Sequence, residues 1–205
     1  MIKFRLFWDL NEEENWINTV QTNGYRLVGV RPCLHCYEFQ ALTSTESLNP
    51  YTRLDFRDRG MKRRDYQDYR QLFNDSGWQL IAGSRHGGTQ YFQQRRETAV
   101  RDIFSDEQSR QQSRRRFMRY GYINGYLFLM MFLMLLWENP DVSLFNFRSW
   151  YLTPGLWQMP SEWFWKALLF ETPFVLFRMG TTFIFFIVGM YYFGRAIYAN
   201  CKKTL

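Results

Sequence analysis

The sequence predicts an α+β domain followed by a two-helix transmembrane hairpin, and three observations support this prediction. The stretch Tyr120–Trp137 has eighteen residues without a charge, directly after a run of five arginines. A second uncharged stretch, Met179–Gly194, lies near the C-terminus. The first hundred residues instead alternate strand-like and helix-like patterns. The chain of 205 residues therefore has room for one domain of ordinary polarity and one membrane unit.

The first hundred residues resemble a tandem repeat with an offset of fifty-three positions. Gly24-Tyr25-x-Leu27 recurs as Gly77-Trp78-x-Leu80, and Phe39-Gln40 recurs as Phe92-Gln93. Each copy is expected to contain a strand, a helix and two more strands. Elements that bury one face each predict residues 1–100 to be a cytoplasmic domain, in which one antiparallel-rich sheet carries two helices on one face. The expected elements are Lys3–Trp8, Asn11–Asn23, Tyr25–Arg31 and Leu34–Leu42, then Tyr51–Phe56, Arg63–Asp75, Trp78–Ser84 and Thr89–Gln94.

One long helix is expected from about Asp106 to Trp137. Ser105 and Gln108 form a capping-box pattern, and neither Gly nor Pro follows before Gly121. Residues 101–119 are predicted to be a basic, polar stalk that is solvated all round. Residues 120–137 are the first predicted span, because a helix of that length is about 27 Å long and can cross the hydrocarbon core of a bilayer.

Residues 138–172 are predicted to form an extracytoplasmic loop rich in aromatic side chains. Within it, Glu162–Phe170 is expected to be a helix lying at the membrane interface. A third span is the alternative, but it would place Lys166 and Glu171 in hydrocarbon. The second span is predicted at residues 173–198, with Pro173 in its first turn, and residues 199–205 form a cytoplasmic tail.

The charge distribution predicts the orientation in the membrane. Residues 1–109 are neutral overall, residues 110–119 carry +5, residues 120–177 carry −2 and residues 178–205 carry +4. Basic residues beside the apolar stretches are the positive-inside pattern, so both termini are expected in the cytoplasm of a multi-pass plasma-membrane protein. Nucleic acid is not an expected partner, since no folded basic face is indicated. The predicted contacts with anionic lipid are Arg110, Arg114, Arg115, Arg116, Arg119, Lys202 and Lys203.

Cys33 and Cys36 form the sharpest local motif, a CxxC pair. A zinc site needs four ligands, and the further candidates are His86 and Cys201. Structural thiols are the favoured interpretation, with a metal site assisted by His86 or a redox pair as alternatives. Three cysteines without an export signal argue against a disulfide framework.

The sequence contains none of the common catalytic motifs, such as a nucleophile elbow, a phosphate loop or HExxH. We therefore predict a protein without enzymatic activity, without a catalytic residue and without a cofactor. Two polar positions in the apolar stretches, Asn124 and Arg178, are candidates for contacts within the membrane. For Arg178 the simpler interpretation is a side chain that extends to the membrane surface.

Several motifs in order resemble the bacterial domain-of-unknown-function 2812 family over roughly residues 1–115. The resemblance implies a cytoplasmic α+β domain followed by transmembrane helices. Because members are often encoded beside PadR-like transcriptional regulators, it also implies a regulatory setting. The motifs are Phe7-Trp8, Glu13-Glu14-x-Trp16, Gly24-Tyr25-x-Leu27, Tyr37-x-Phe39, Tyr51-x-x-x-Asp55, Gly77-Trp78, Tyr91-Phe92 and Ile103-Phe104-Ser105-Asp106.

Together these features predict a membrane-anchored regulatory or sensory protein in the bacterial cell membrane. Its cytoplasmic domain is expected to bind a protein partner, for which a transcriptional regulator is one candidate. The alternative is an accessory subunit of a membrane transporter or envelope complex, with Asn124 and Arg178 among its contacts.

Overall fold

The computed structural model describes residues 1–32, 35–42, 51–95, 103, 107–138, 143–144 and 146–202. The chain forms two compact units. The first contains residues 1–120 together with 195–205, and the second contains residues 121–194. Each unit is described by itself.

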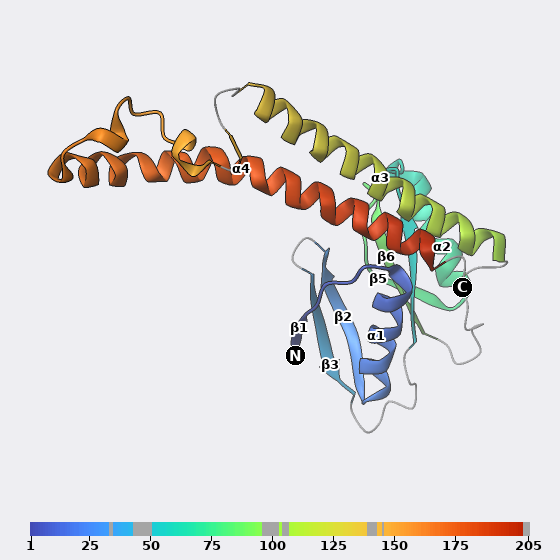
Figure 1. Cartoon of the computed structure of the whole chain (residues 1–205). Helices are drawn as coiled ribbons and strands as arrows, with labels where there is room; N and C mark the ends of the chain where they lie inside the picture. Colours follow the sequence, from blue (N-terminus) through green and yellow to red (C-terminus); the bar gives the residue numbers. More distant parts are fainter. Residues whose placement is uncertain are drawn as a thin grey trace. The chain divides into compact units, whose positions relative to one another are not determined.

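The first unit contains two strand–helix–strand–strand segments in succession, in the order predicted from the sequence (Figure 1). All helices and strands fall within a few residues of their predicted bounds, and Tyr25–Arg31 and Arg63–Asp75 match them. The elements are β1 (Ile2–Phe4), α1 (Leu10–Thr22), β2 (Tyr25–Arg31) and β3 (Cys36–Ala41), then β4 (Thr52–Arg57), α2 (Arg63–Asp75), β5 (Trp78–Ala82) and β6 (Gly88–Gln94).

The strands are antiparallel as predicted, but they form two three-stranded sheets where the sequence predicted one. The orders are β1-β3-β2 and β4-β6-β5, so each segment closes its own sheet with the same topology. In both sheets the register shifts at one place, between Leu27 and Gly29 of β2 and between Leu80 and Ala82 of β5. Gly24 and Gly77, which follow the two helices, have φ of 86° and 85°. These positive angles are the left-handed conformation that ends a helix and that glycine adopts without strain.

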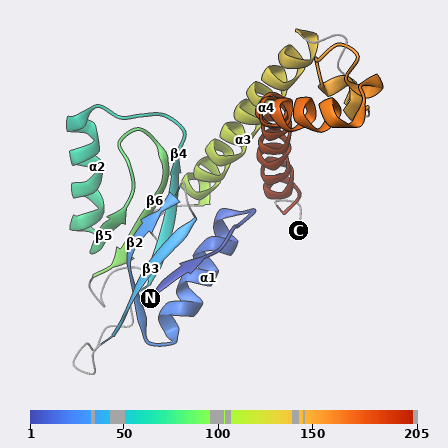
Figure 2. The ribbon, with the colours of Figure 1, turned by 90° about the vertical axis from the view of Figure 1, so that its left-hand side faces the viewer.

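The two helices pack on opposite sides of β6, whereas the sequence predicted both on one face. Tyr91 belongs to the larger hydrophobic cluster, which includes Ile17 of α1, and the next residue, Phe92, belongs to a second cluster with Tyr69 of α2. Successive side chains of a strand point to opposite faces, so each face of β6 meets a different helix. Figure 2 shows α2 on one side of the strands and α1 on the other.

Helix α3 (Glu107–Trp137) begins inside the first unit and corrects the expectation of a fully solvated stalk. Phe117 is 5% exposed and joins the larger hydrophobic cluster, and Ser113 is 3% exposed. The expectation failed because it used polarity alone. Ser113, Arg116 and Phe117 place one apolar and hydrogen-bonding face of α3 against β4, although the average polarity of this stretch is high.

Helix α4 runs without interruption from Ser161 to Cys201, so the predicted interfacial helix and second span are one element. Pro173 lies inside it. A proline has no backbone N–H, so the carbonyl oxygen of Leu169, one turn before Pro173, lacks its usual helical donor, and α4 nevertheless continues through this position. Two short 3-10 helices, Phe147–Trp150 and Leu156–Gln158, precede α4. Glu171 holds this connection, because its carboxylate accepts from the backbone N–H and the hydroxyl of Thr153 at 3.2 and 2.5 Å.

In the second unit, α3 and α4 pack as an antiparallel pair. A Cβ added at Gly125 would lie 2.9 Å from the ring of Phe193, and one at Gly189 would lie 3.3 Å from the backbone of Leu129. The two helices therefore approach closely at Gly125 and Gly189, and the absence of a side chain at these positions allows it.

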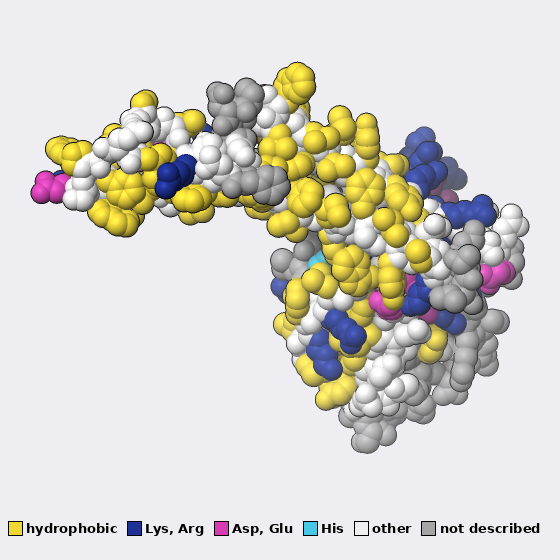
Figure 3. All heavy atoms as spheres, viewed as in Figure 1, with side chains coloured by type: hydrophobic (Ala, Val, Ile, Leu, Met, Phe, Trp, Pro, Cys, Tyr) yellow, Lys and Arg dark blue, Asp and Glu magenta, His cyan; other side chains and the backbone are white. Residues whose placement is uncertain are grey.

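Both long helices are apolar enough and long enough to cross a membrane, by length and composition. Only 17% and 22% of the residues in their most apolar windows are buried, so most of this apolar surface is exposed. Figure 3 shows hydrophobic side chains covering the visible face of both helices.

Candidate functional site

The outer edge of β4 is covered by side chains of α1 and α3. Residues one helical turn apart on α1 advance about 6 Å, and alternate residues of a strand advance about 6.6 Å, so the two repeats nearly match. The edge strand is thereby closed to other strands. The amide of Thr52 donates to Asn18 Oδ1 at 2.8 Å, that of Leu54 to Glu14 Oε2 at 3.0 Å, and that of Phe56 to Ser113 Oγ at 2.8 Å.

Glu13 is a buried carboxylate that joins α1 to both sheets. It is 4% exposed, and Oε1 accepts hydrogen bonds from the hydroxyls of Tyr37 on β3, at 2.7 Å, and Tyr91 on β6. Burial raises the pKa of Glu13, while the two hydroxyls and the charge of Arg195 act to lower it. Because its hydrogen bonds join α1 to β3 and β6, we assign this carboxylate a structural role.

Asp55 joins β4 to α2 and α3. It is 1% exposed and accepts from four side chains, which satisfies a buried carboxylate fully. The donors are Ser113 at 2.7 Å, Tyr69 and Arg57 at 2.8 Å, and Arg116 at 3.0 Å.

The last turns of α4 belong to the first unit and are bound to it by side chains. Ala196 and Ala199 are fully buried, and Ala199 joins the larger hydrophobic cluster. The guanidinium of Arg114 donates through Nε, at 3.1 Å, and Nη2 to the carbonyl oxygen of Ala199. This carbonyl lies in the last turn of a helix, where no intrahelical donor remains and where positive charge is favoured.

The first turn of α1 provides the acidic partners for the end of α4. The hydroxyl of Tyr198 donates to Glu12, and the ammonium of Lys202 lies 3.2 Å from the same carboxylate and 4.0 Å from Asp9. The hydrogen bond from Tyr198 is the main interaction that lowers the pKa of Glu12, with smaller contributions from Lys202. These contacts join residues that are almost the whole chain length apart.

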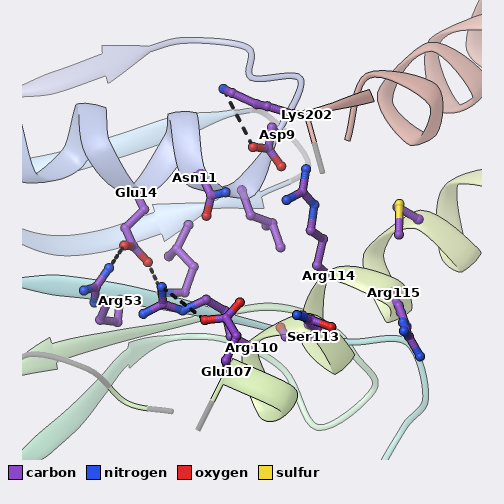
Figure 4. Close-up of a pocket in the computed structure, with 14 residues that line it drawn as sticks. Asp9, Asn11, Glu14, Arg53, Glu107, Arg110, Ser113, Arg114, Arg115 and Lys202 are labelled. Carbon is purple, nitrogen blue, oxygen red and sulfur yellow. Dashed lines mark hydrogen bonds and ion pairs between the residues drawn. The ribbon is translucent and has the colours of Figure 1, made fainter. Parts of the chain in front are cut away.

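A cavity of about 280 Å³ lies beside these contacts, between α1, β4, the start of α3 and the end of α4. Figure 4 shows Asp9 and Lys202 together on one side of it, Glu14 and Arg53 on another, and Arg114 across from Glu14 and Arg53. Five basic and three acidic residues line the cavity, so its lining is positively charged overall. The lining residues are Asp9, Leu10, Asn11, Glu14, Arg53, Leu54, Glu107, Arg110, Gln111, Ser113, Arg114, Arg115, Met118 and Lys202.

Most of the basic residues assigned to the membrane surface have a protein partner. Lipid contact remains a prediction for all of them, and Arg110 and Arg115 are the exposed arginines among those that line the cavity. Lys203 lies outside the described residues. Arg114 binds Ala199, Arg116 binds Asp55, Arg119 binds Asp58, Arg110 lies 3.9 Å from Glu107, and Lys202 binds Glu12.

The described residues do not bring the metal candidates together. Cys36 begins β3 in the first sheet, whereas His86 lies in the turn before β6 in the second. Cys33 lies outside the described residues. Among the residues that the structure describes, no group of three His, Cys, Asp or Glu side chains is placed to hold a metal ion.

The two intramembrane candidates lie in the second unit. The guanidinium of Arg178 donates to the carbonyl oxygen of Trp150, so the side chain is engaged within this unit. Asn124 precedes the close helix contact at Gly125 and is half-buried.

The sequence analysis missed the buried polar network and the cavity. The available signal was the placement of Glu13, Glu14, Asn18 and Gln21 at the same three- and four-residue spacing as the apolar residues Leu10 and Ile17. Polar residues within an apolar stripe indicate buried hydrogen bonds.

The comparisons with known proteins agree with the resemblance found in the sequence. A family model described as "Protein of unknown function (DUF2812)" matches residues 9–125, which is more than half of the chain. No curated protein and no solved structure matches this chain. The matched range contains Glu13, Glu14 and Asp55, so it covers the network that joins α1, α2 and α3 to the strands. The chain therefore belongs to the DUF2812 family.

Proposed function

We propose that this chain is a membrane-anchored regulatory protein whose α+β unit binds a protein partner, for which a transcriptional regulator is the leading candidate. The observation that supports this proposal most directly is that the last turns of α4 are part of the core of the α+β unit. A change in the position or tilt of α4 within a bilayer would act directly on that core.

The exposed apolar surface of α3 and α4 supports anchoring in a bilayer. Phe177 and Trp137 are 81% and 88% exposed, and a soluble protein rarely exposes so many large apolar side chains in one region. Both helices are also too exposed to be the core of a soluble domain. We therefore infer two spans in the plasma membrane.

The position of the helix ends supports the proposed orientation. The start of α3 and the end of α4 both lie in the first unit, where Arg114 binds Ala199. If the start of α3 and the end of α4 lie in one unit, both spans leave the bilayer on the same side. The basic residues near these two helix ends favour the cytoplasm for that side, and the connection before α4 then lies on the opposite side of the membrane.

Orientation can be tested by labelling single cysteines in intact cells with a membrane-impermeant maleimide. A cysteine at Phe147, which is 56% exposed in the connection, should react without permeabilisation. Cys201, which is exposed at the end of α4, should react only after permeabilisation. Equal labelling of both positions in intact cells would contradict the proposed topology.

The partner can be tested by photocrosslinking the full-length protein in cells. A photoreactive residue at Leu72, which is 64% exposed on α2, captures proteins that bind the α+β unit. One at Phe177 captures proteins that bind the apolar surface of α4. Capture of a regulator in the membrane fraction from Leu72, with none from Phe177, supports the proposal. Repeated absence of a specific product from Leu72 and from a second exposed position, Val28, counts against it.

The alternative, an accessory subunit of a transporter or envelope complex, predicts integral membrane proteins crosslinked from Phe177. It draws support from exposed aromatic side chains on α4, such as Trp163 and Trp165 at 64% and 65% exposure. The structure weakens the argument from Arg178 for this alternative, because the Arg178 guanidinium already binds the carbonyl oxygen of Trp150. Reversal of the charge at Arg178 should reduce recovery of a membrane partner only under this alternative.

A further inference from the structure

The cavity beside the end of α4 has the size and polarity of a site for a small anionic ligand. A volume of about 280 Å³ corresponds to on the order of nine water molecules, which is room for a small phosphate ester. Its lining has two more basic than acidic residues, which favours an anion. Leu10, Leu54 and Met118 supply an apolar part of the wall for the carbon atoms of such a ligand.

Arg114 is held in position to bind an oxyanion. A guanidinium has five N–H donors, and the Ala199 carbonyl takes those of Nε and Nη2 that point toward it. This contact fixes the plane of the guanidinium, and Arg114 lines the cavity. A planar guanidinium whose orientation is already fixed loses little entropy when it binds a phosphate group.

Asp9 supplies a second, independent requirement, namely a hydrogen-bond donor on the ligand. Its side chain is 1% exposed and lines the cavity, yet Oδ2 accepts no hydrogen bond from the described residues. The Lys202 ammonium lies 4.0 Å from Oδ2, which is beyond hydrogen-bond distance. Buried polar atoms are rarely without a partner, so an acceptor at this position calls for a hydroxyl or similar donor.

We propose that this cavity binds a phosphate ester that carries a free hydroxyl group, with Arg114 and Lys202 receiving the phosphate and Asp9 receiving the hydroxyl. Glycerol phosphate has this chemistry, both as a soluble molecule and as the headgroup of phosphatidylglycerol. The ligand would then contact the end of α4 and the start of α1 at once. The proposal concerns this cavity alone and stands whether or not the α+β unit binds a regulator.

The test is calorimetric titration of the full-length protein in phosphatidylcholine nanodiscs with sn-glycerol 3-phosphate, inorganic phosphate and glycerol. We expect glycerol 3-phosphate to bind more tightly than either of the others, because only it satisfies both the arginine and Asp9. Arg114→Gln should weaken binding about tenfold, the loss expected for one charge-assisted hydrogen bond. Asp9→Asn should reduce the preference for glycerol 3-phosphate over inorganic phosphate.

Two further variants separate specific binding from folding and from general attraction. Arg115→Gln leaves the contact between Arg114 and Ala199 intact and should weaken binding about threefold, as expected for one exposed charge. Arg119 is on the same helix, but it binds Asp58 and does not line the cavity. Arg119→Gln therefore removes one charge of α3 and should leave the affinity unchanged. Equal losses from Arg119→Gln and Arg115→Gln would overturn the proposal, since they would indicate attraction to net charge alone.

Nanodiscs that contain phosphatidylglycerol identify the source of the ligand. A weaker apparent affinity for soluble glycerol 3-phosphate in these discs supports the site with the lipid headgroup as its occupant. An unchanged affinity supports it with a soluble ligand. If glycerol 3-phosphate does not bind in phosphatidylcholine discs and Arg115→Gln does not reduce preferential association with phosphatidylglycerol, the proposal is wrong.

Discussion

The side chain of Asn18 and the backbone of Thr52 exchange two hydrogen bonds, in which Oδ1 accepts from the Thr52 amide at 2.8 Å and Nδ2 donates to its carbonyl oxygen at 2.9 Å. The amide group of one side chain thus pairs with the edge of β4 as a neighbouring strand would. Glu14 repeats the contact one helical turn earlier, at Leu54. Helix α1 therefore replaces a fourth strand at this edge of the sheet.

Asn18→Ala should lower the free energy of unfolding by about 2 kcal/mol, because it leaves a buried N–H and a buried carbonyl of Thr52 without partners. Denaturant unfolding of the purified full-length protein measures the loss. Asn15→Ala removes the same side chain from an exposed position on the same helix and should change the free energy by less than about 0.5 kcal/mol. Equal effects of the two substitutions would show that α1 tolerates loss of the β4 contact.

Glu13→Gln should change how stability depends on pH. Burial raises the pKa of Glu13 in the folded protein, so the folded state binds its proton more tightly than the unfolded state does. The carboxyl group therefore contributes less stability as the pH rises from the unfolded pKa, near 4.5, through the raised folded pKa. A glutamine carries no charge, so the variant should gain stability relative to the native chain over this interval.

Unfolding at a series of pH values measures this effect, and the difference between the two proteins should be constant above the folded pKa. Glu14 also has a pKa that burial raises, and it is present in both proteins, so it does not contribute to the difference. A difference that is independent of pH throughout would contradict the assignment.

Asp55→Asn should lower the free energy of unfolding by about 3 kcal/mol, because it leaves the guanidiniums of Arg57 and Arg116 beside a neutral buried group. The start of α3 should also become more sensitive to protease, since Ser113 and Arg116 are both held by Asp55. Asp58→Asn is the matched control, because it breaks an exposed pair with Arg119 and should cost about 0–1 kcal/mol. Similar losses from the two variants would refute the central role of Asp55.

Gly125→Ala should destabilise the helix pair of the second unit. The added methyl group would lie 2.9 Å from the Phe193 ring, so the ring or the helices must shift, at a cost of about 1–3 kcal/mol. Thermal unfolding in detergent should detect it. A Cβ added at Gly180 meets nothing within 4 Å, so Gly180→Ala should not lower the melting temperature and should raise it slightly, because alanine favours a helix more than glycine does. A lower melting temperature for that variant alone would reverse the assignment.

Local patterns were sufficient to predict most elements of the first unit. The repeated motif that begins at Gly24 and at Gly77 indicated two copies with the same order of elements, and the structure contains that order. The division into two sheets was not predictable, because strand periodicity says which residues form a strand and not which strands pair. The continuous α4 was missed because a proline is typical of the first turn of a helix, whereas Pro173 lies inside α4.

The candidate site was less accessible to sequence reasoning than the fold. Arg114 and Ala199 are eighty-five positions apart, and no local pattern relates them. The arginine run was interpreted as one basic surface, yet its members point to different partners, Arg114 to Ala199 and Arg116 to Asp55. Each partner is set by which helix face a residue occupies in the folded protein, which composition does not record.

The burial of Ala196 and Ala199 in the first unit has a consequence for biosynthesis. The ribosome makes these residues after α3 and most of α4, so the α+β unit has to wait for them with part of its core uncovered. Newly made chains that stall before α4 would present Phe117 and its neighbours to chaperones or proteases. Completion of the core of the first unit is thereby tied to synthesis of α4, and a fragment that ends with α3 is an incomplete folding unit.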